Sequence, residues 1–228
     1  MKILFTFYFF LFTSFVAFSQ ADKGWQQLFD GKTLNGWTKL VGTADYKVED
    51  GAIVGITTAG SPNTFLVNNK KFPRDFVLEM EVKMDDSTTN SGIQFKSNYD
   101  SLANKGKGKV FGYQFELDPS TRKWSGGVYD EGRREWLYPA SLNSKAQTLF
   151  TTGVYHKVKI ECSGATIKTW LDGVAVAYVI DTLKKNEGLI ALQVHSISRA
   201  EQAGTKLYWK NIRINTANVS STTFPKGI

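Results

Sequence analysis

The sequence predicts an all-β protein that folds as a two-sheet sandwich of the jelly-roll type. Short runs in which apolar and polar residues alternate recur through most of the chain, whereas the periodicity of helices is almost absent. Gly, Asn, Asp and Pro separate about a dozen such runs, and many short strands with frequent turns are typical of sandwiches. No internal repeat, linker or low-complexity block divides the sequence, so we expect one domain.

The strands can be assigned in order from the turns that join them. Asp50-Gly51 and Asp172-Gly173 are two-residue turn signals, and each is expected to join the two strands of a hairpin. The segments expected to form strands are residues 46–54 (a hairpin), 76–84, 91–96, 111–118, 158–162, 167–171, 174–179, 189–195 and 206–214. Residues 139–150 fit either a short helix or a loop.

The amino terminus has the pattern of a secretory signal peptide over residues 1–19. A lysine precedes an apolar run at residues 3–18, and Ala17 and Ser19 place small side chains before a cut at Gln20. The run is shorter than the roughly 20 residues that span a bilayer, which argues against a membrane anchor. No cysteine directly follows the cut for lipid attachment, so we expect an exported protein, either periplasmic or secreted.

The rest of the chain is expected to hold a single domain at residues 24–215 and a loose polar tail at residues 216–228. Cys162 is the only cysteine, so no intramolecular disulfide can form, and its phase within a strand predicts a buried core thiol. The formal net charge is +7, but lysine and arginine are scattered among acids rather than gathered along one element. This distribution disfavours nucleic acid as a partner.

The residues that point to a function follow the strand expected at 111–118. Its apolar residues alternate with Gln114, Glu116 and Asp118, which therefore share the opposite face. The segment that follows supplies aromatic and charged residues that could reach this face, namely Trp124, Tyr129, Glu131, Arg133 and Arg134. Carboxylates and amides bind sugar hydroxyls, and aromatic rings stack on the C–H faces of sugars, so a carbohydrate is the first candidate ligand.

A second polar strand carries the candidate acid–base residue. Gln193 and His195 share a face, and histidine titrates near neutral pH. We expect Glu116 or Asp118 to lie on a neighbouring strand and to fix the tautomer of His195. The other ligand contacts expected from an adjacent strand are Asn90 and Gln94.

The two acids of the first polar strand are also suited to conventional glycoside hydrolysis. Glu116 and Asp118 lie two residues apart, which is about 6.6 Å along an extended strand. Side-chain flexion lets their carboxyl groups lie roughly 5 to 9 Å apart, a range that includes both the retaining and the inverting geometry. Together with His195 they could also hold a divalent cation, and calcium at a loop is a further possibility. No metal-binding motif is evident, and no other cofactor is expected.

Several separated motifs resemble one family, and they occur in the order expected for it. They are Leu28-Phe-Asp-Gly-Lys-Thr-Leu-Asn-Gly-Trp37, Val48-Glu-Asp-Gly-Ala-Ile53, Asn90-Ser-Gly-Ile93, Gly112-Tyr-Gln-Phe-Glu116, Gly126-Gly-Val-Tyr129, Gly188-Leu-Ile-Ala-Leu-Gln-Val-His195 and Trp209-Lys-Asn-Ile-Arg-Ile214. On these residues the chain resembles the 3-keto-disaccharide hydrolases, also described as the 3-keto-glucoside-1,2-lyase/3-keto-2-hydroxy-glucal hydratase domain. The resemblance spans residues 24–215. It implies a concanavalin-like, lectin/glucanase-type sandwich that acts on or binds sugars in exported bacterial proteins.

The resemblance implies chemistry that starts from a ketone at C3 of the sugar. That ketone acidifies the proton on C2, so a base can remove it, an enolate forms and the C1 substituent leaves by β-elimination. Addition of water then completes a net hydrolysis. His195 or Glu116 is the expected base. Arg133 or Arg134 is expected to stabilise the enolate. Tyr129 or Glu131 is expected to interact with the leaving oxygen.

Two other functions remain open at the level of sequence. A non-catalytic, lectin-like glycan-binding module would use the same aromatic and polar residues. A conventional two-carboxylate glycoside hydrolase would act on unoxidised sugar. A carbohydrate is the expected partner in every case, and the keto-sugar enzyme additionally implies an upstream sugar oxidoreductase that makes its substrate.

Overall fold

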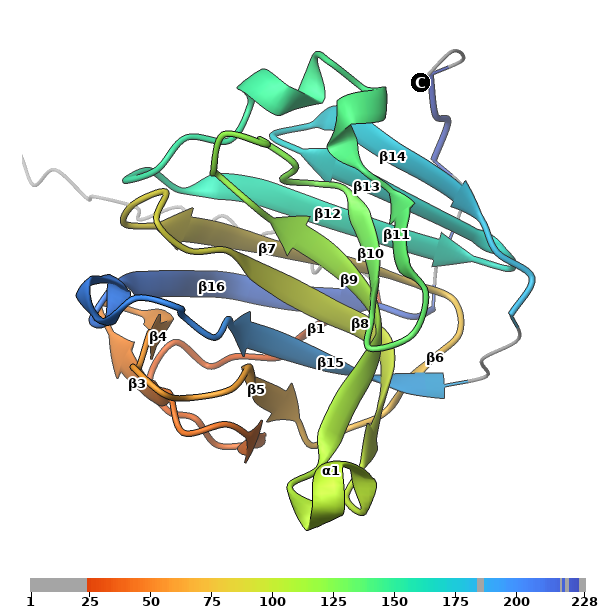
Figure 1. The fold of residues 1–228 in the computed structure, drawn as a ribbon. Helices are drawn as coiled ribbons and strands as arrows, with labels where there is room; N and C mark the ends of the chain where they lie inside the picture. Colours follow the sequence, from red (N-terminus) through yellow and green to blue (C-terminus); the bar gives the residue numbers. More distant parts are fainter. Residues whose placement is uncertain (1–23, 184–186, 218, 220–221, 226–228) are drawn as a thin grey trace, which may run out of the picture.

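The computed structural model describes residues 24–183, 187–217, 219 and 222–225. The predicted signal peptide at residues 1–19 lies outside these residues. Within them, sixteen strands form two antiparallel sheets of eight strands each, which are stacked as a sandwich (Figure 1). The prediction of an all-β sandwich is confirmed. None of the helices in the described part of the chain has the length and apolarity needed to cross a bilayer.

Each sheet collects strands from distant parts of the chain. Sheet A contains β1 (Trp25–Gln27), β3 (Asp45–Glu49), β4 (Ala52–Ile56), β7 (Phe76–Met84), β12 (His156–Ser163), β13 (Thr166–Leu171), β14 (Val174–Ile180) and β16 (Lys206–Asn215). Sheet B contains β2 (Trp37–Val41), β5 (Thr64–Asn68), β6 (Phe72–Pro73), β8 (Ser91–Asp100), β9 (Lys109–Leu117), β10 (Val128–Glu131), β11 (Glu135–Tyr138) and β15 (Glu187–Val194). The strand order is β14-β13-β12-β7-β16-β4-β3 in sheet A, with β1 beside β16. It is β11-β10-β9-β8-β15-β5-β2 in sheet B, with β6 beside β15.

The core lies between the two sheets and follows from the alternation in the sequence. On β7, the five apolar residues that the pattern places on one face are all buried, and the charged residues between them are only partly buried. Trp209 of β16 is 1 % exposed, and its ring lies 6.4 Å from the ring of Tyr46. Cys162 is buried, as predicted. Burying one large apolar side chain contributes about 1.5–3 kcal/mol, so this core is the main source of stability.

Both predicted Asp-Gly turns are present. Asp50 and Gly51 have φ of 48° and 75° and join β3 to β4. Asp172 and Gly173 have φ of 50° and 79° and join β13 to β14. Positive φ at both central residues is the type I′ geometry, which matches the twist of the flanking strands. The dipeptides therefore determine where these two hairpins turn.

Two segments refine the sequence-based expectation. Residues 139–150 contain two short 3-10 helices, η1 (Ala140–Leu142) and η2 (Ala146–Thr148). The aromatic segment after Asp118, expected as a loop, contains the hairpin of β10 and β11, in which Tyr129 pairs with Trp136. This hairpin extends sheet B beyond β9 and brings aromatic residues beside the polar strand.

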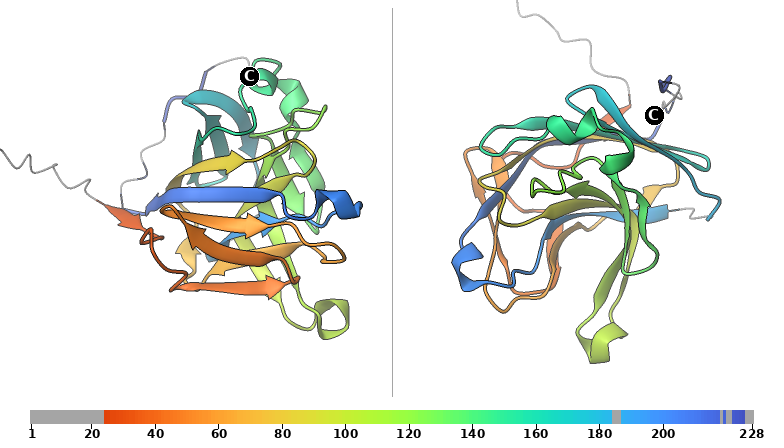
Figure 2. Two further views of the ribbon diagram at one scale, coloured as in Figure 1. Left: turned by 90° about the vertical axis from the view of Figure 1, so that its left-hand side faces the viewer. Right: turned by 45° about the horizontal axis from the view of Figure 1, so that its top comes forward.

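The hairpin of β8 and β9 extends beyond the body of the sandwich (Figure 2). A single helical turn, α1 (Ala103–Gly106), lies at its tip, where Asn104 and Lys105 have positive φ. The basic, glycine-rich stretch at residues 105–109 therefore begins in this exposed turn and leads into β9. The remaining short helix, η3 (Ala200–Gln202), precedes β16.

The sequence predicts a loose tail from residue 216, but two described residues of the tail contact sheet A. Thr222 accepts a hydrogen bond from Lys159 Nζ at 2.9 Å, and its backbone N–H donates to Glu161 Oε1 at 3.0 Å. Phe224 lies 5.5 Å from the ring of Trp170. Glu161 is fully buried and needs such partners, which explains why the tail is held at this point.

Candidate functional site

The outer face of sheet B holds a row of buried polar side chains. On β9, Gln114 and Glu116 alternate with core residues, and Asp118 follows directly after the strand. Gln94 of β8 lies opposite Gln114, and Gln193 of β15 lies one strand further along. None of the five residues is more than 4 % exposed, although all of them point away from the core. This face is therefore polar and shielded from water, which suits a polar ligand.

Glu116 is the most perturbed acid of this row. Burial raises the pKa of Glu116 to about 8, because a carboxylate loses its hydration inside the protein. A hydrogen bond from Gln114 Nε2, at 2.8 Å, acts in the opposite direction. The charge of Asp118 raises the pKa further. Glu116 is therefore protonated at neutral pH and can donate a proton.

Asp118 is paired with Arg122, a residue that the sequence-based prediction missed. Arg122 Nη2 lies 2.7 Å from Asp118 Oδ2, and the backbone N–H of Ser120 donates to Asp118 Oδ1 at 3.1 Å. The guanidinium of Arg122 also lies over the ring of Trp124, 4.9 Å from its centroid. An acid followed four residues later by an arginine in a turn is the signal that could have revealed this cation.

His195 follows β15 and is held by a backbone carbonyl. Its Nδ1 lies 2.6 Å from the carbonyl oxygen of Ser196, which can only accept, so Nδ1 carries the proton and Nε2 bears the lone pair of the neutral ring. Burial lowers the pKa of His195 and keeps the ring neutral near pH 7. The prediction that a carboxylate fixes this tautomer is wrong. Strand β8 separates β15 from the strand of Glu116, and Ser196 fixes the tautomer instead.

Two side-chain amides of the site have buried atoms without hydrogen-bond partners in the part of the chain that the structure describes. Gln193 is fully buried, and among the described residues neither its Nε2 nor its Oε1 has a hydrogen-bond partner. The Oδ1 atom of Asn90 is in the same condition. Leaving a buried polar group unpaired costs about 1–3 kcal/mol. Such groups on the face that holds Glu116 are therefore best explained as groups whose partners a ligand supplies.

An aromatic wall borders the polar row. The ring of Trp136 lies 4.7 Å from that of Trp124 and 5.1 Å from that of Tyr129, in edge-on arrangements. All three residues are partly exposed. Tyr129 pairs with Gln114 across β10 and β9, so the wall adjoins the buried amides. Trp124 and Tyr129 therefore lie where the sequence-based prediction needs them, with ring surface left for stacking.

Two depressions meet at His195 and Ser196. The first, of about 350 Å³, is also lined by residues 87–90, Asp118, Ser120, Arg122, Ile197, Ser198 and Gln202. The second, of about 340 Å³, is also lined by Val41, Pro62, Asn63, Phe65, Asn104, Lys109, Val110 and Glu131. We call the two depressions together the groove, and His195 borders both of them.

Glu131 is a second perturbed acid of sheet B, and it lines the second depression. Burial raises the pKa of Glu131, and a hydrogen bond from the side chain of Asn63 opposes the shift. Asn63 Oδ1 also accepts the backbone N–H of Ser196 at 2.9 Å. Asn63 is thus a second residue of the site that the sequence-based prediction missed. It lies far from the other residues in the chain, so no local pattern could have identified it.

The prediction that Arg133 and Arg134 face the ligand is wrong. Arg133 Nε donates to Asp130 Oδ1 at 2.6 Å, and Arg134 Nε donates to Asp130 Oδ2 at 2.5 Å. A second nitrogen of Arg134 lies 2.5 Å from Asp181 Oδ2. Asp130 is fully buried and alternates with Tyr129, so it points to the other side of β10. A buried carboxylate needs cationic partners, and both arginines turn away from the groove to supply them.

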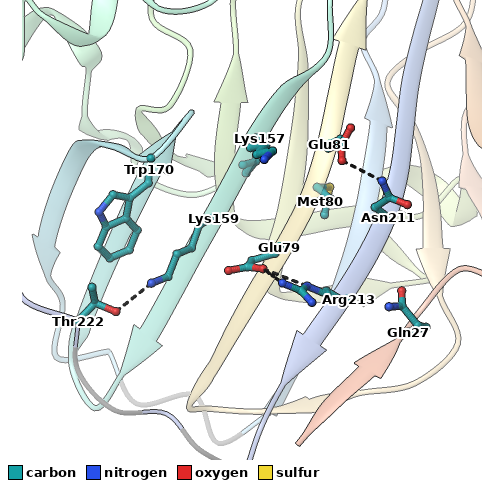
Figure 3. A pocket seen from close by; sticks show the side chains of 12 residues that line it. Gln27, Glu79, Met80, Glu81, Lys157, Lys159, Trp170, Asn211, Arg213 and Thr222 are labelled. Atoms are coloured by element: carbon teal, nitrogen blue, oxygen red, sulfur yellow. Dashed lines mark hydrogen bonds and ion pairs between the residues drawn. The ribbon is translucent and has the colours of Figure 1, made fainter. Parts of the chain in front are cut away.

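A wider depression, of about 690 Å³, lies on the outer face of sheet A (Figure 3). Several of its polar side chains form hydrogen bonds or ion pairs with one another. The pairs are Glu79 with Arg213 at 2.7 Å, Glu81 with Asn211 at 2.8 Å and Lys159 with Thr222 at 2.9 Å. We therefore place the candidate site on sheet B, where buried amides lack partners among the described residues.

The fit of a divalent cation can be judged from the donor atoms. Within the part of the chain that the structure describes, no group of three or more His, Cys, Asp or Glu side chains is arranged to hold a metal ion. Of the predicted set, Asp118 is paired with Arg122 and Glu116 is protonated at neutral pH. These donors do not fit a divalent cation in that state, so we derive no step through a metal.

The sequence profile of the 3-keto-alpha-glucoside-1,2-lyase-like domain matches residues 24–215, a range that includes every residue of the groove. The chain belongs to this family. The resemblance predicted from the separated motifs is thereby confirmed. No curated protein matches the chain.

Solved structures with the same fold include several carbohydrate-related proteins. A candidate glycosyl hydrolase from Parabacteroides distasonis ATCC 8503 is 18 % identical with a TM-score of 0.57, over 86 % of this chain and 94 % of that chain. A native glycosidic hydrolase is 11 % identical with a TM-score of 0.56, over 85 % and 95 %. The carbohydrate recognition domain of Emp47p is 13 % identical with a TM-score of 0.54, over 87 % and 97 %. These likenesses confirm the predicted lectin/glucanase-type fold.

Proposed function

We propose that this protein cleaves 3-keto-glycosides by removing the C2 proton and eliminating the C1 substituent. Membership of the family supports a sugar derivative as substrate. The observation that carries the proposal is that two pKa values on one face are displaced in opposite directions. Burial raises the pKa of Glu116 to about 8 and lowers that of His195. At neutral pH the site therefore contains both a protonated acid and a neutral base.

His195 is the base, because its Nδ1 proton is held by Ser196 and its Nε2 can accept. Nε2 takes the C2 proton, and the electrons of the C–H bond form the C2=C3 bond of an enolate with its charge on the C3 oxygen. When the C3 ketone reforms, C1=C2 forms and the C1–O bond breaks, while Glu116 gives its proton to the leaving oxygen. The products are a 3-keto-2-hydroxy-glucal and an alcohol.

Hydration runs through the same two residues in the opposite sense. The ionised Glu116 takes a proton from the water that adds to C1, and the protonated His195 returns its proton to C2. The sum is hydrolysis of the glycosidic bond with both residues restored. Lyase and hydratase activities therefore need no additional acid or base.

Other groups on this face of sheet B bind and orient the sugar. The unpaired amide of Gln193 and Oδ1 of Asn90 are suited to sugar hydroxyls, and the aromatic wall is suited to stacking on the ring. Arg122 replaces Arg133 and Arg134 as the cation that stabilises the enolate, because it lines the groove and they do not. We also propose export, from the sequence of residues 1–19, and an upstream oxidation that makes the keto sugar.

Incubation of the protein with a 3-keto-glucoside and with its unoxidised parent, with and without chelator, tests this function. We expect aglycone release from the keto substrate alone, with no effect of chelator. Loss of activity with chelator would assign a divalent cation to the site, which contradicts the metal-free steps above. Release from the parent sugar would indicate conventional two-carboxylate hydrolysis by Glu116 and Asp118.

A glycan-binding module is the second candidate function, and one observation favours it. The fold is shared with the Emp47p carbohydrate recognition domain as well as with hydrolases. No release from either substrate, combined with retained binding of the sugars by calorimetry, would establish this second function and exclude the first.

A further inference from the structure

Strand β8 contains a β-bulge beside the candidate site. Its register against β9 shifts after Phe95, and Lys96 has a φ of 47°. Regular alternation from Gln94 would turn Ser97 to the core side with Phe95, but the extra residue turns Ser97 to the outer face. Gly112 of β9 leaves the space, because a Cβ there would lie 2.6 Å from Ser97 Oγ. The bulge therefore places a buried hydroxyl beside the polar row.

This hydroxyl starts a chain of side-chain hydrogen bonds that ends at Glu116. Ser97 Oγ lies 2.6 Å from Gln94 Oε1, and 3.1 and 3.3 Å from two backbone carbonyl oxygens. All three neighbours are acceptors, so the hydroxyl donates, and Gln94 is the nearest. Gln94 Nε2 then donates to Gln114 Oε1 at 2.6 Å, and Gln114 Nε2 donates to Glu116 Oε2 at 2.8 Å.

We propose that Ser97 is a positioning residue, whose hydroxyl sets the direction of the Gln94 and Gln114 amides so that Glu116 receives an N–H group. An amide can present either its N–H or its carbonyl to a neighbour. If both amides reversed, the Ser97 hydroxyl would lose its nearest acceptor, Gln94 Oε1 at 2.6 Å, and would donate only over the longer contacts of 3.1 and 3.3 Å to backbone carbonyl oxygens. The four side chains of this hydrogen-bond series are almost fully buried, so water does not compete for their hydrogen bonds.

The direction of the chain matters for proton transfer at Glu116. An N–H group from Gln114 stabilises the ionised form that Glu116 must reach when it gives up its proton. Reversal of both amides would present the carbonyl of Gln114, which favours the protonated form. Loss of the Ser97 hydroxyl is therefore expected to raise the pKa of Glu116 above its value of about 8.

The test compares Ser97→Ala with Ser91→Ala. Both residues are fully buried on β8 and both donate a hydrogen bond at 2.6 Å, but Ser91 donates to the backbone carbonyl of Gln193 and is outside the chain. The titration of Glu116 is followed by carbon-13 NMR of labelled carboxyl groups, with Glu116→Gln to assign the resonance. We expect Ser97→Ala to raise the midpoint by roughly 1 to 2 pH units, and Ser91→Ala to leave it unchanged.

An unchanged midpoint in Ser97→Ala, or an equal rise in Ser91→Ala, would overturn the proposal. If Ser97→Ala does not fold, Gln94→Met interrupts the chain one step later and is expected to give the same rise. The kinetic consequence rests on the proposed function: the alkaline limb of kcat/KM on a 3-keto-glucoside should move with the NMR midpoint. A protein without turnover would contradict the function alone, because the NMR titration needs no substrate.

Discussion

The two outer faces of the sandwich carry the same kinds of side chain and use them differently. On sheet A, carboxylates, amides and cations pair with each other, as Glu79 does with Arg213 (Figure 3). On sheet B, Gln193 has no partner among the described residues, and burial keeps Glu116 protonated. Polar composition therefore does not identify a site. On sheet B, unmet hydrogen bonds and displaced pKa values occur together on one face, and each costs folding free energy that a ligand can offset.

The largest expected difference between the faces is in activity. We expect Glu116→Gln and His195→Asn each to lower kcat/KM on a 3-keto-glucoside by 100-fold or more, since general acid–base groups contribute roughly 10²–10⁴-fold. Glu79→Gln on sheet A is the matched control and should stay within about 2-fold, because it removes no proton-transfer group. Near-wild-type turnover in both sheet-B variants would show that the acid–base assignment is wrong.

Sheet A should instead lose stability when one of its pairs is broken. Glu161 and Lys168 are 0 % and 4 % exposed, and Lys168 Nζ lies 3.2 Å from Glu161 Oε1. Glu161→Ala leaves a buried cation without this partner, so we expect a loss of about 3–5 kcal/mol in urea unfolding. The double variant Glu161→Leu/Lys168→Met should recover most of that loss. If Glu161→Ala were as stable as the wild type, the pairs on sheet A would not stabilise the fold, and the proposed contrast with sheet B would be wrong.

Replacement of Glu116 is expected to raise the unfolding free energy at high pH, whereas replacement of Glu161 lowers it. The reason is that burial is unfavourable for the charged form of Glu116. Its pKa is raised from 4.5 to about 8 on folding, so the folded state holds the extra proton and loses relative stability as pH rises from about 5 through 8. Glu116→Gln carries no such charge. We expect this variant to be more stable than the wild type by about 2 kcal/mol or more at pH 9, with little difference at pH 5. Equal stability at both pH values would contradict the raised pKa.

The smallest expected effect concerns the unpaired amide of Gln193. Gln193→Leu removes two buried groups without partners, so we expect unfolding free energy to rise by about 1 kcal/mol while KM for the keto sugar rises about 10-fold. Asn143→Leu is the control, since Asn143 Nδ2 is paired with the carbonyl of Ala175 at 3.0 Å and its loss should destabilise the fold. A destabilised Gln193→Leu with unchanged KM would make Gln193 a structural residue.

Sequence reasoning located the acids and the base but not how they are used. The alternation in residues 111–118 correctly placed Gln114 and Glu116 on the face opposite the core. It could not show that these outward side chains are buried, because burial depends on how the whole chain packs. The raised pKa of Glu116 follows from that burial and was invisible in the pattern.

The errors have a common cause in long-range pairing. The period of two along a strand tells which face a side chain takes, but it does not tell which strand lies beside it. The sequence could not show that strand β8 lies between β15, which precedes His195, and β9, which carries Glu116. Arg133 and Arg134 point away from the groove because both donate hydrogen bonds to the buried carboxylate of Asp130. The spacing of residues in the sequence does not show that Asp130 is buried.

The sequence by itself determined the longer strands, the two Asp-Gly turns and the face that carries the polar row, because local periodicity and turn stereochemistry act over a few residues. It did not indicate the short strands β1, β2, β5, β6, β10 and β11. Only the tertiary structure decided the strand order, the bulge that turns Ser97 outward and the lack of partners for Gln193 among the described residues. These features depend on hydrogen-bond registers and on burial between segments far apart in the chain. The identity of the acids and base is thus local information, whereas their protonation states are a property of the fold.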